Sequence, residues 1–214
     1  MRGRRIVKGI MVLVVLVVIV VMMGCNSGGV SEGSQAKATK ADGSVIDLKV
    51  IREKIKSAVE FAGKVKEVHT LVKSVDELAK AIGKKVEGAG NLSDDGGQNG
   101  SLISAAYSII SSVSTKLETL EQQAEVSTEL KAKITIVKTG SKKFTDTVKG
   151  ASADLGKKDA SDENAKKALL KSDAVGDKGA KDLIALNTAI DELLKNAEVA
   201  VASAIKELTT SADN

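Results

Sequence analysis

The sequence contains no proline and no tryptophan, one histidine, one cysteine, and only 1% aromatic residues. Without proline, no residue breaks a helix by its ring geometry. The scarcity of aromatic residues argues against a strand-rich core. A single cysteine forms no intramolecular disulfide. These absences favour an all-α protein, and 214 residues suffice for one compact domain or two small ones.

The formal net charge of +4 suggests a basic protein, but the excess lies at one end of the chain. Four basic residues and no acidic residue precede Cys25, so the remaining chain carries 28 residues of each sign. A neutral chain has no global field that steers it to nucleic acid. It also lacks aromatic platforms on which bases stack, because its aromatic residues are Phe61, Tyr107 and Phe144. Nucleic-acid binding is therefore excluded.

The first 24 residues have the anatomy of an export signal. Arg2, Arg4, Arg5 and Lys8 form a positive segment, and an unbroken apolar run covers residues 10–23. That run is short for a membrane span, which favours a signal peptide over residues 1–24. The alternative is a transmembrane anchor that stays attached to the chain.

The end of the apolar run, Val21-Met22-Met23-Gly24-Cys25, resembles the lipobox of bacterial lipoproteins. This resemblance implies cleavage after Gly24, a thioether-linked diacylglyceride on Cys25, and a third acyl chain on the freed amine. Two or more acyl chains anchor a protein stably to a membrane. Residues 25–43 then form a lipidated, flexible tether, because they are rich in Gly, Ser, Lys, Ala and Thr.

A long first helix is predicted from Ser44 to Val86. Ser44 and Asp47 have the spacing of a capping pair. The apolar positions alternate in steps of four and three, which is a heptad seam. They are Phe61, Val65, Val68, Val72, Val75, Ala79, Ile82 and Val86.

Further periodic segments complete the domain. Residues 87–100 are glycine-rich and predict an exposed loop. Heptad steps then cover residues 101–124 and 130–148 with a phase slip near Ser127, which leaves open whether residues 101–148 form one helix or two. A short helix is predicted over residues 161–171 and a long one over 180–208. The sequence thus predicts an elongated antiparallel bundle of about five helices over residues 44–210, with a tail over 211–214.

The sequence supplies no catalytic constellation and no cofactor or metal site. His69 has no partner of the kinds that bind metal or assist a nucleophile, so we interpret it as an interfacial or solvated histidine. Residues 150–158 lack the spacing and the hydroxyl of a P-loop. The lysine doublets at 84–85, 142–143 and 157–158 are candidates for contact with a sulfated glycan, although such doublets are usually solvated. We therefore expect no enzymatic activity.

Several blocks of sequence carry a family resemblance. They are LVKSVDELAKAIGKKV at 71–86, NGSLISAAY at 99–107, and the shorter blocks at 155–158, 165–171, 177–183 and 205–209. Together they resemble the outer surface protein C and variable small protein family of Borrelia lipoproteins. The chain lacks a second cysteine, which favours the variable small proteins of relapsing fever.

This resemblance implies an outer-membrane, surface-exposed location, a mainly helical homodimer, and antigenic variation in which one variant is expressed at a time. Host antibodies are then the expected partners, and immune evasion the expected function. One alternative is an adhesin for a host glycosaminoglycan or serum protein, and another is a periplasmic structural lipoprotein. Exposed loops tolerate substitution, so residues 87–100 and the turn at 151–161 are the expected targets of variant-specific antibodies.

Overall fold

The computed structural model describes residues 37–39, 45–123 and 126–212. The chain divides into two units, Met1–Ala36 and Lys37–Asn214, and all described residues belong to the second. Within them lie six α-helices, one 3₁₀ helix and two short antiparallel hairpins. The signal peptide and Cys25, predicted above, lie outside the described residues.

The first hairpin precedes the first long helix. Strand β1 (Lys37–Thr39) pairs with β2 (Val45–Asp47), so the end of the predicted tether takes part in a sheet. Helix α2 (Leu48–Leu78) then begins after Asp47, whose side chain accepts a 2.9 Å hydrogen bond from the backbone N–H of Lys49. The predicted start at Ser44 is therefore wrong, because Asp47 is the capping residue and not the partner of a cap at Ser44.

The predicted end of this helix at Val86 is also wrong. Helix α2 passes into the 3₁₀ helix η1 (Ala79–Ala81), and Gly83 then takes a φ of +66°. This left-handed conformation, which favours glycine, turns the chain out of the helix. Val86, which continues the heptad spacing, instead belongs to strand β3 (Lys84–Val86). This strand pairs with β4 (Leu92–Asp94) inside the predicted loop.

Residues 101–148 form two helices. Helix α3 (Gly100–Glu121) and helix α4 (Thr128–Gly150) are separated at the phase slip. Ser127 starts α4, because its Oγ accepts a hydrogen bond from the backbone N–H of Leu130. Residues 124 and 125, in the connection, lie outside the described residues.

The last part of the chain holds three helices. A single turn, α5 (Ser152–Leu155), precedes α6 (Asp162–Leu169), which Ser161 caps. Helix α7 (Ala180–Ala212) follows and extends two residues into the predicted tail. At 1.5 Å per residue, α2 and α7 are about 46 and 50 Å long.

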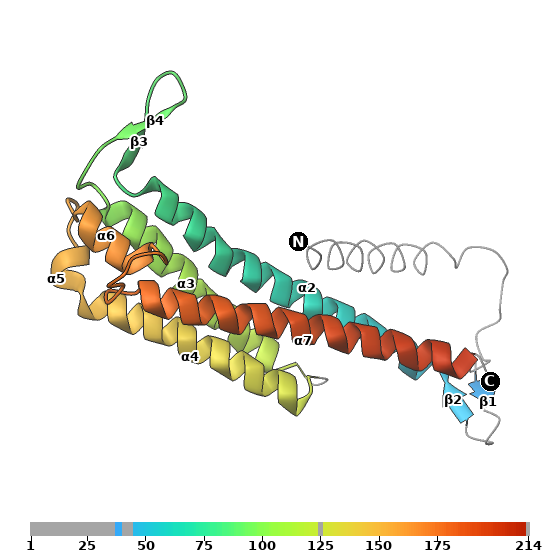
Figure 1. Cartoon of the computed structure of the whole chain (residues 1–214). Helices are drawn as coiled ribbons and strands as arrows, with labels where there is room; N and C mark the ends of the chain where they lie inside the picture. The colour runs from blue at the N-terminus through green and yellow to red at the C-terminus, as the bar shows by residue number, and fades with distance from the viewer. Residues whose placement is uncertain (1–36, 40–44, 124–125, 213–214) are drawn as a thin grey trace. The chain divides into compact units, whose positions relative to one another are not determined.

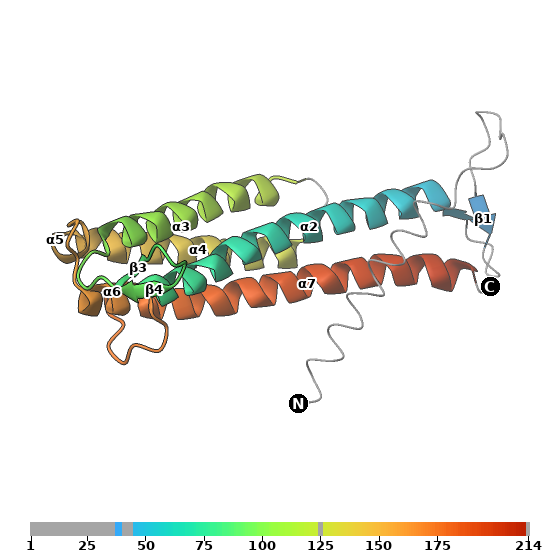
Figure 2. The same cartoon turned by 90° about the horizontal axis from the view of Figure 1, so that it is seen from above.

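The four long helices form the bundle, in which α2 packs on α3 and α7, and α4 packs on α3 and α7. Helices α2 and α7 run antiparallel, since Lys54 near the start of α2 forms a 3.1 Å ion pair with Glu207 near the end of α7. Both views show these two helices extending beyond α3 and α4 at the end where β1 and β2 lie (Figures 1 and 2). The prediction of an all-α, elongated antiparallel bundle is confirmed.

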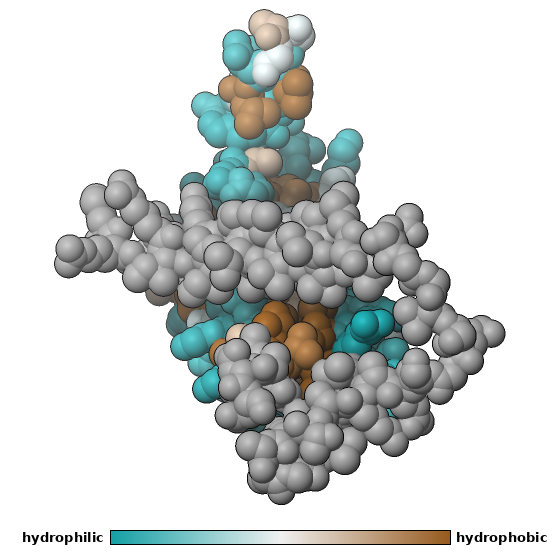
Figure 3. All heavy atoms as spheres, turned by 90° about the vertical axis from the view of Figure 1, so that its right-hand side faces the viewer, coloured by the Kyte–Doolittle hydropathy of each residue, from teal (hydrophilic) through white to brown (hydrophobic). Residues whose placement is uncertain are grey.

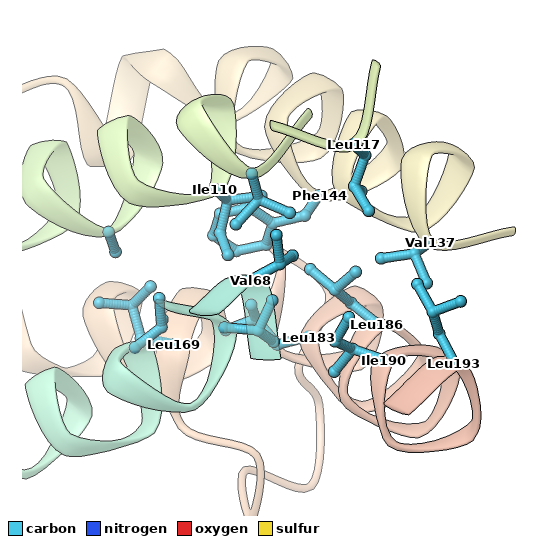
Figure 4. Close-up of a cluster of buried hydrophobic side chains, with 14 of the residues drawn as sticks. Val68, Ile110, Leu117, Val137, Phe144, Leu169, Leu183, Leu186, Ile190 and Leu193 are labelled. Atoms are coloured by element: carbon cyan, nitrogen blue, oxygen red, sulfur yellow. The ribbon is translucent and has the colours of Figure 1, made fainter. Parts of the chain in front are cut away.

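The predicted heptad seams form one hydrophobic core. Side chains from α2, α3, α4, α6 and α7 point into a common interior, where Phe144 and Ile110 meet leucines of α7 (Figure 4). Seam residues such as Val72, Val113 and Ile190 have no exposed surface. Burial of this apolar surface, at about 25 cal/mol per Å², stabilises the bundle and leaves its loops without core packing.

Candidate functional site at the end of the bundle

The β3–β4 hairpin projects from the end of the bundle opposite β1 and β2 (Figure 1). Its register pairs Lys84 with Asp94 and Val86 with Leu92. The Lys84 Nζ lies 2.5 Å from the Asp94 Oδ1, and this hydrogen bond lowers the pKa of Asp94. Val86 and Leu92 are 75% and 59% exposed, and hydrophobic atoms are visible among hydrophilic ones on the projecting hairpin (Figure 3). The hairpin therefore presents its side chains to solvent and not to the core.

Asn99 fastens the base of this hairpin to the bundle. Its side chain is 2% exposed. The Asn99 Oδ1 accepts a 2.8 Å hydrogen bond from the backbone N–H of Gly83. Its Nδ2 donates to the carbonyl of Ala160 at 3.0 Å and to Asp162 Oδ1 at 2.8 Å. One buried amide thus joins the hairpin, the start of α3 and the segment that leads into α6.

Asp162, the first residue of α6, completes the attachment. Its Oδ1 also accepts a 3.0 Å hydrogen bond from the backbone N–H of Gly97. The hydrogen bonds from Gly97 and from Asn99 hold the pKa of the Asp162 carboxyl below its usual value. The charged carboxylate is therefore the form that fixes the hairpin.

The structure also brings the predicted loop at 87–100 beside the turn at 151–161. The backbone N–H groups of Asn99 and Gly100 donate to the carbonyls of Ala160 and Lys158, both at 3.3 Å. A Cβ atom at Gly100 would lie 2.2 Å from the carbonyl oxygen of Lys157, so only glycine permits this approach. Two segments separated by some sixty residues therefore form one continuous end surface.

The three lysine doublets differ in their surroundings. Lys84 and Lys85 pair with Asp94 and Asp95. Lys142 pairs with Asp146, and Lys143 pairs with Asp182. Lys157 and Lys158 are exposed and form no ion pair within the described part of the chain. An anionic glycan would meet largely neutralised lysines at the first two doublets.

His69 is an interfacial histidine. Its Nε2 lies 2.8 Å from the Asp191 Oδ1, and Lys73 pairs with the same carboxylate at 2.9 Å. These contacts tie α2 to α7 on the bundle surface. Among residues 37–39, 45–123 and 126–212, no group of three or more His, Cys, Asp or Glu side chains has the arrangement of a metal site.

An open groove of about 480 Å³ lies between α3 and α4. Several of its hydroxyls, such as those of Ser111 and Thr139, donate to backbone carbonyls of their own helices. Such hydroxyls are engaged in local structure. None of the helices that the structure describes combines the length and apolar character needed to cross a membrane.

Sequence reasoning identified the segments of this end surface but missed Asn99 and Asp162, the residues that assemble it. Asn99 falls within a block that carries the family resemblance, and Asp162 falls within the helix predicted over residues 161–171. A buried Asn directly before a helix carries no periodic signal. Its role depends on Gly83 and Asp162, which lie 16 and 63 positions away in the sequence.

Comparison with known proteins extends these observations. Residues 45–214 match a protein-family model described as Lipoprotein (Lipoprotein_6). The chain is 40% identical over 202 residues to variable small protein 11 of Borrelia hermsii, covering 93% of this chain and 96% of that protein. It is 41% identical over 199 residues to an outer surface protein C of Borreliella burgdorferi, with 92% of each covered.

A solved structure agrees with the fold. The structure of variable small protein 1 of Borrelia turicatae superposes with a TM-score of 0.72 at 54% sequence identity, and covers 76% of this chain and 99% of that one. Sequence and fold therefore agree over about three quarters of this chain. This chain belongs to the variable small protein and outer surface protein C family of surface lipoproteins.

Proposed function

We propose that this chain is an antigenically variable outer-membrane surface lipoprotein, anchored by lipid on Cys25, that serves immune evasion by switching among variants and has no catalytic activity. One observation carries the proposal. The loop at 87–100 and the turn at 151–161 form a joint surface at the end of the bundle opposite β1 and β2.

The division between core and tip supports variation. The heptad seams are buried, whereas all three residues of β3 are exposed. Exposed substitutions away from buried contacts change stability by about 0.5 kcal/mol or less. The exposed residues among 84–94 are therefore free to change while the bundle keeps its fold, apart from Gly90, whose φ of +83° favours glycine.

The orientation of the bundle supports presentation of this surface to the host. The predicted lipid at Cys25 precedes β1, and the antiparallel pairing of α2 with α7 brings the C-terminal end of α7 to the same end. A membrane at that end leaves the β3–β4 hairpin at the far end. Antibodies approaching from outside then meet the hairpin first.

A loop graft tests the proposal. Residues 84–94 are replaced by those of a sibling variant, while Gly83, Asn99 and Asp162 are kept so that the hairpin attachment survives. Variant-specific sera on live cells are expected to follow the grafted hairpin. The matched control replaces exposed residues of α7, such as Ile184 and Val199, with those of the sibling. If sera followed the α7 surface instead, the proposal would be wrong.

An adhesin for a host glycosaminoglycan or serum protein is the second candidate. The exposed and unneutralised pair Lys157 and Lys158 favours it. A Lys157→Ala/Lys158→Ala variant should lose binding to host glycan that a Lys84→Ala/Lys85→Ala variant keeps. Equal binding by both variants and the parent would count against these lysines as the contact.

A homodimer belongs to the same proposal. Leu71 and Leu78 of α2, with Leu102 and Ile109 of α3, pack against the core but remain half-buried. A second copy is the proposed cover for this apolar flank. Sedimentation equilibrium should give twice the monomer mass, and Leu71→Glu should shift the chain toward monomer. A parent that sediments as a monomer at micromolar concentration would refute the dimer.

A further inference from the structure

Three basic residues form a stripe on the first turns of α2. Lys49, Arg52 and Lys56 are all exposed. At 100° per residue they lie about 100–160° around the helix from the buried Ile51. The basic stripe, as we call these three residues, therefore points away from the bundle.

The basic stripe does not contribute to the ion pairs that hold the bundle together. Within the described part of the chain, none of its three side chains forms an ion pair, whereas the neighbouring Lys54 pairs with Glu207. Glu53 and Glu60 lie beside the stripe in sequence but form no ion pair with it in this part of the chain. The three charges are left to solvent or to a partner.

The basic stripe also opposes the helix dipole. Helices α4, α6 and α7 each carry an acidic residue in the first turn, as the positive end of a helix favours. Helices α2 and α3 carry none, and Lys49 stands in the first turn of α2. The Asp47 carboxylate at the cap supplies the negative charge that this helix end favours, so the basic stripe adds positive charge that the fold does not require.

The chain length places the basic stripe near the membrane. Residues 26–36 separate Cys25 from Lys37. At no more than about 3.5 Å per residue, these eleven residues reach at most about 40 Å in any conformation. Strand β1 then pairs directly with β2, the strand that leads into α2. The start of α2 is thus tethered within a limited reach of the bilayer that holds the proposed anchor.

We propose that Lys49, Arg52 and Lys56 bind the anionic phospholipid headgroups of the membrane that holds the Cys25 lipid. This inference rests on the proposed lipid anchor. The anchor keeps the chain at the surface, and the basic stripe draws the base of the bundle onto it, because basic side chains beside an anionic membrane are attracted to it. The stripe thereby sets how the bundle stands on the cell.

The experiment uses the full lipidated protein reconstituted into vesicles. Cys25 is the only cysteine and the proposed acylation occupies its sulfur, so Val50→Cys introduces a single free thiol in the first turn of α2. A fluorophore on that thiol is quenched by spin-labelled lipid in the outer leaflet. We expect quenching to be at least about twofold stronger in vesicles with 30% phosphatidylglycerol than in pure phosphatidylcholine. At about 1 M NaCl, where the Debye length is about 3 Å, the difference should disappear.

Two charge-reversal variants of the same labelled protein test the proposal. Lys49→Glu/Arg52→Glu/Lys56→Glu should abolish the difference between the vesicles, and it leaves the core intact because all three positions are exposed. Lys149→Glu/Lys157→Glu/Lys158→Glu, which reverses three exposed lysines near the other end of the bundle, should keep the difference. Equal quenching of the parent in both vesicles, or loss of the difference in the control, would overturn the proposal. Failure to float with phosphatidylcholine vesicles would instead refute the lipid anchor, and with it the basis of the inference.

Discussion

Asn99 donates a 2.8 Å hydrogen bond from its Nδ2 to the Asp162 Oδ1, across 63 residues of sequence. The same amide accepts from Gly83, so it joins the base of the β3–β4 hairpin to the start of α6. The hairpin proposed as the antigenic tip is therefore positioned by a buried polar contact and not by hydrophobic packing.

Asn99→Ala should lower the free energy of unfolding by about 1–3 kcal/mol, because it leaves the Gly83 N–H without a partner and removes the side-chain hydrogen bonds to Ala160 and Asp162. Urea denaturation measures this loss, and hydrogen exchange should show faster exchange over residues 83–97. Asp94→Asn is the control, because Asp94 is exposed and its ion pair with Lys84 contributes little. Unchanged exchange in Asn99→Ala would contradict the role assigned to this amide.

Asp162 should make hairpin attachment depend on pH. Its pKa is lower in the folded chain than the ordinary value of about 3.9, so the folded state favours the charged form. The stability it contributes is present above about pH 4 and is lost as the pH falls through the lower folded pKa. The stability difference between the parent and Asp162→Asn should therefore shrink from pH 6 to pH 2. A stability difference that grew as the pH fell would contradict this prediction.

Gly100→Ala should destabilise the chain even though alanine is the better helix former. The new Cβ would lie 2.2 Å from the carbonyl oxygen of Lys157, a backbone atom that cannot move without displacing its segment. We expect a loss of about 1–3 kcal/mol. Gly63→Ala, inside α2 with no atom within 4 Å, should gain up to about 1 kcal/mol. Thermal melts of the two variants should move in opposite directions.

Val72→Asp should cost several kcal/mol, because Val72 is completely buried in the seam of α2 and the new charge would have no partner. Val199→Asp, at a position 56% exposed on α7, should cost less than about 1 kcal/mol. Circular dichroism during urea denaturation gives both values. Similar losses in the two variants would argue against the assigned core.

Cys25→Ala should abolish incorporation of radiolabelled palmitate and move the protein into the aqueous phase of a detergent partition. The acyl chains that the lipobox resemblance implies require the Cys25 sulfur, and stable anchoring needs at least two chains. Ser27→Ala, two residues later, should remain labelled. Labelling that persists in Cys25→Ala would refute the predicted lipidation.

The sequence by itself determined the helical seams. Val65, Val68, Val72 and Val75 are buried as their heptad spacing predicts, and the same holds for the seams of α3, α4 and most of α7. Helical periodicity is a local property that places one face toward a core whatever the neighbours are. The antiparallel order of the long helices followed from these seams and from the breaks between them, whereas only the structure divided residues 101–148 into α3 and α4.

Only the tertiary structure decided where the first helix ends and how the tip is held. Ile82 and Val86 both continue the heptad spacing, yet Ile82 is 9% exposed and Val86 is 75% exposed. Between them Gly83 leaves the helix, and its N–H binds Asn99, which in turn binds Asp162. These hydrogen bonds form only after α2, α3 and α6 have packed together. A contact between residues so far apart in sequence leaves no periodic pattern by which the sequence alone could reveal it.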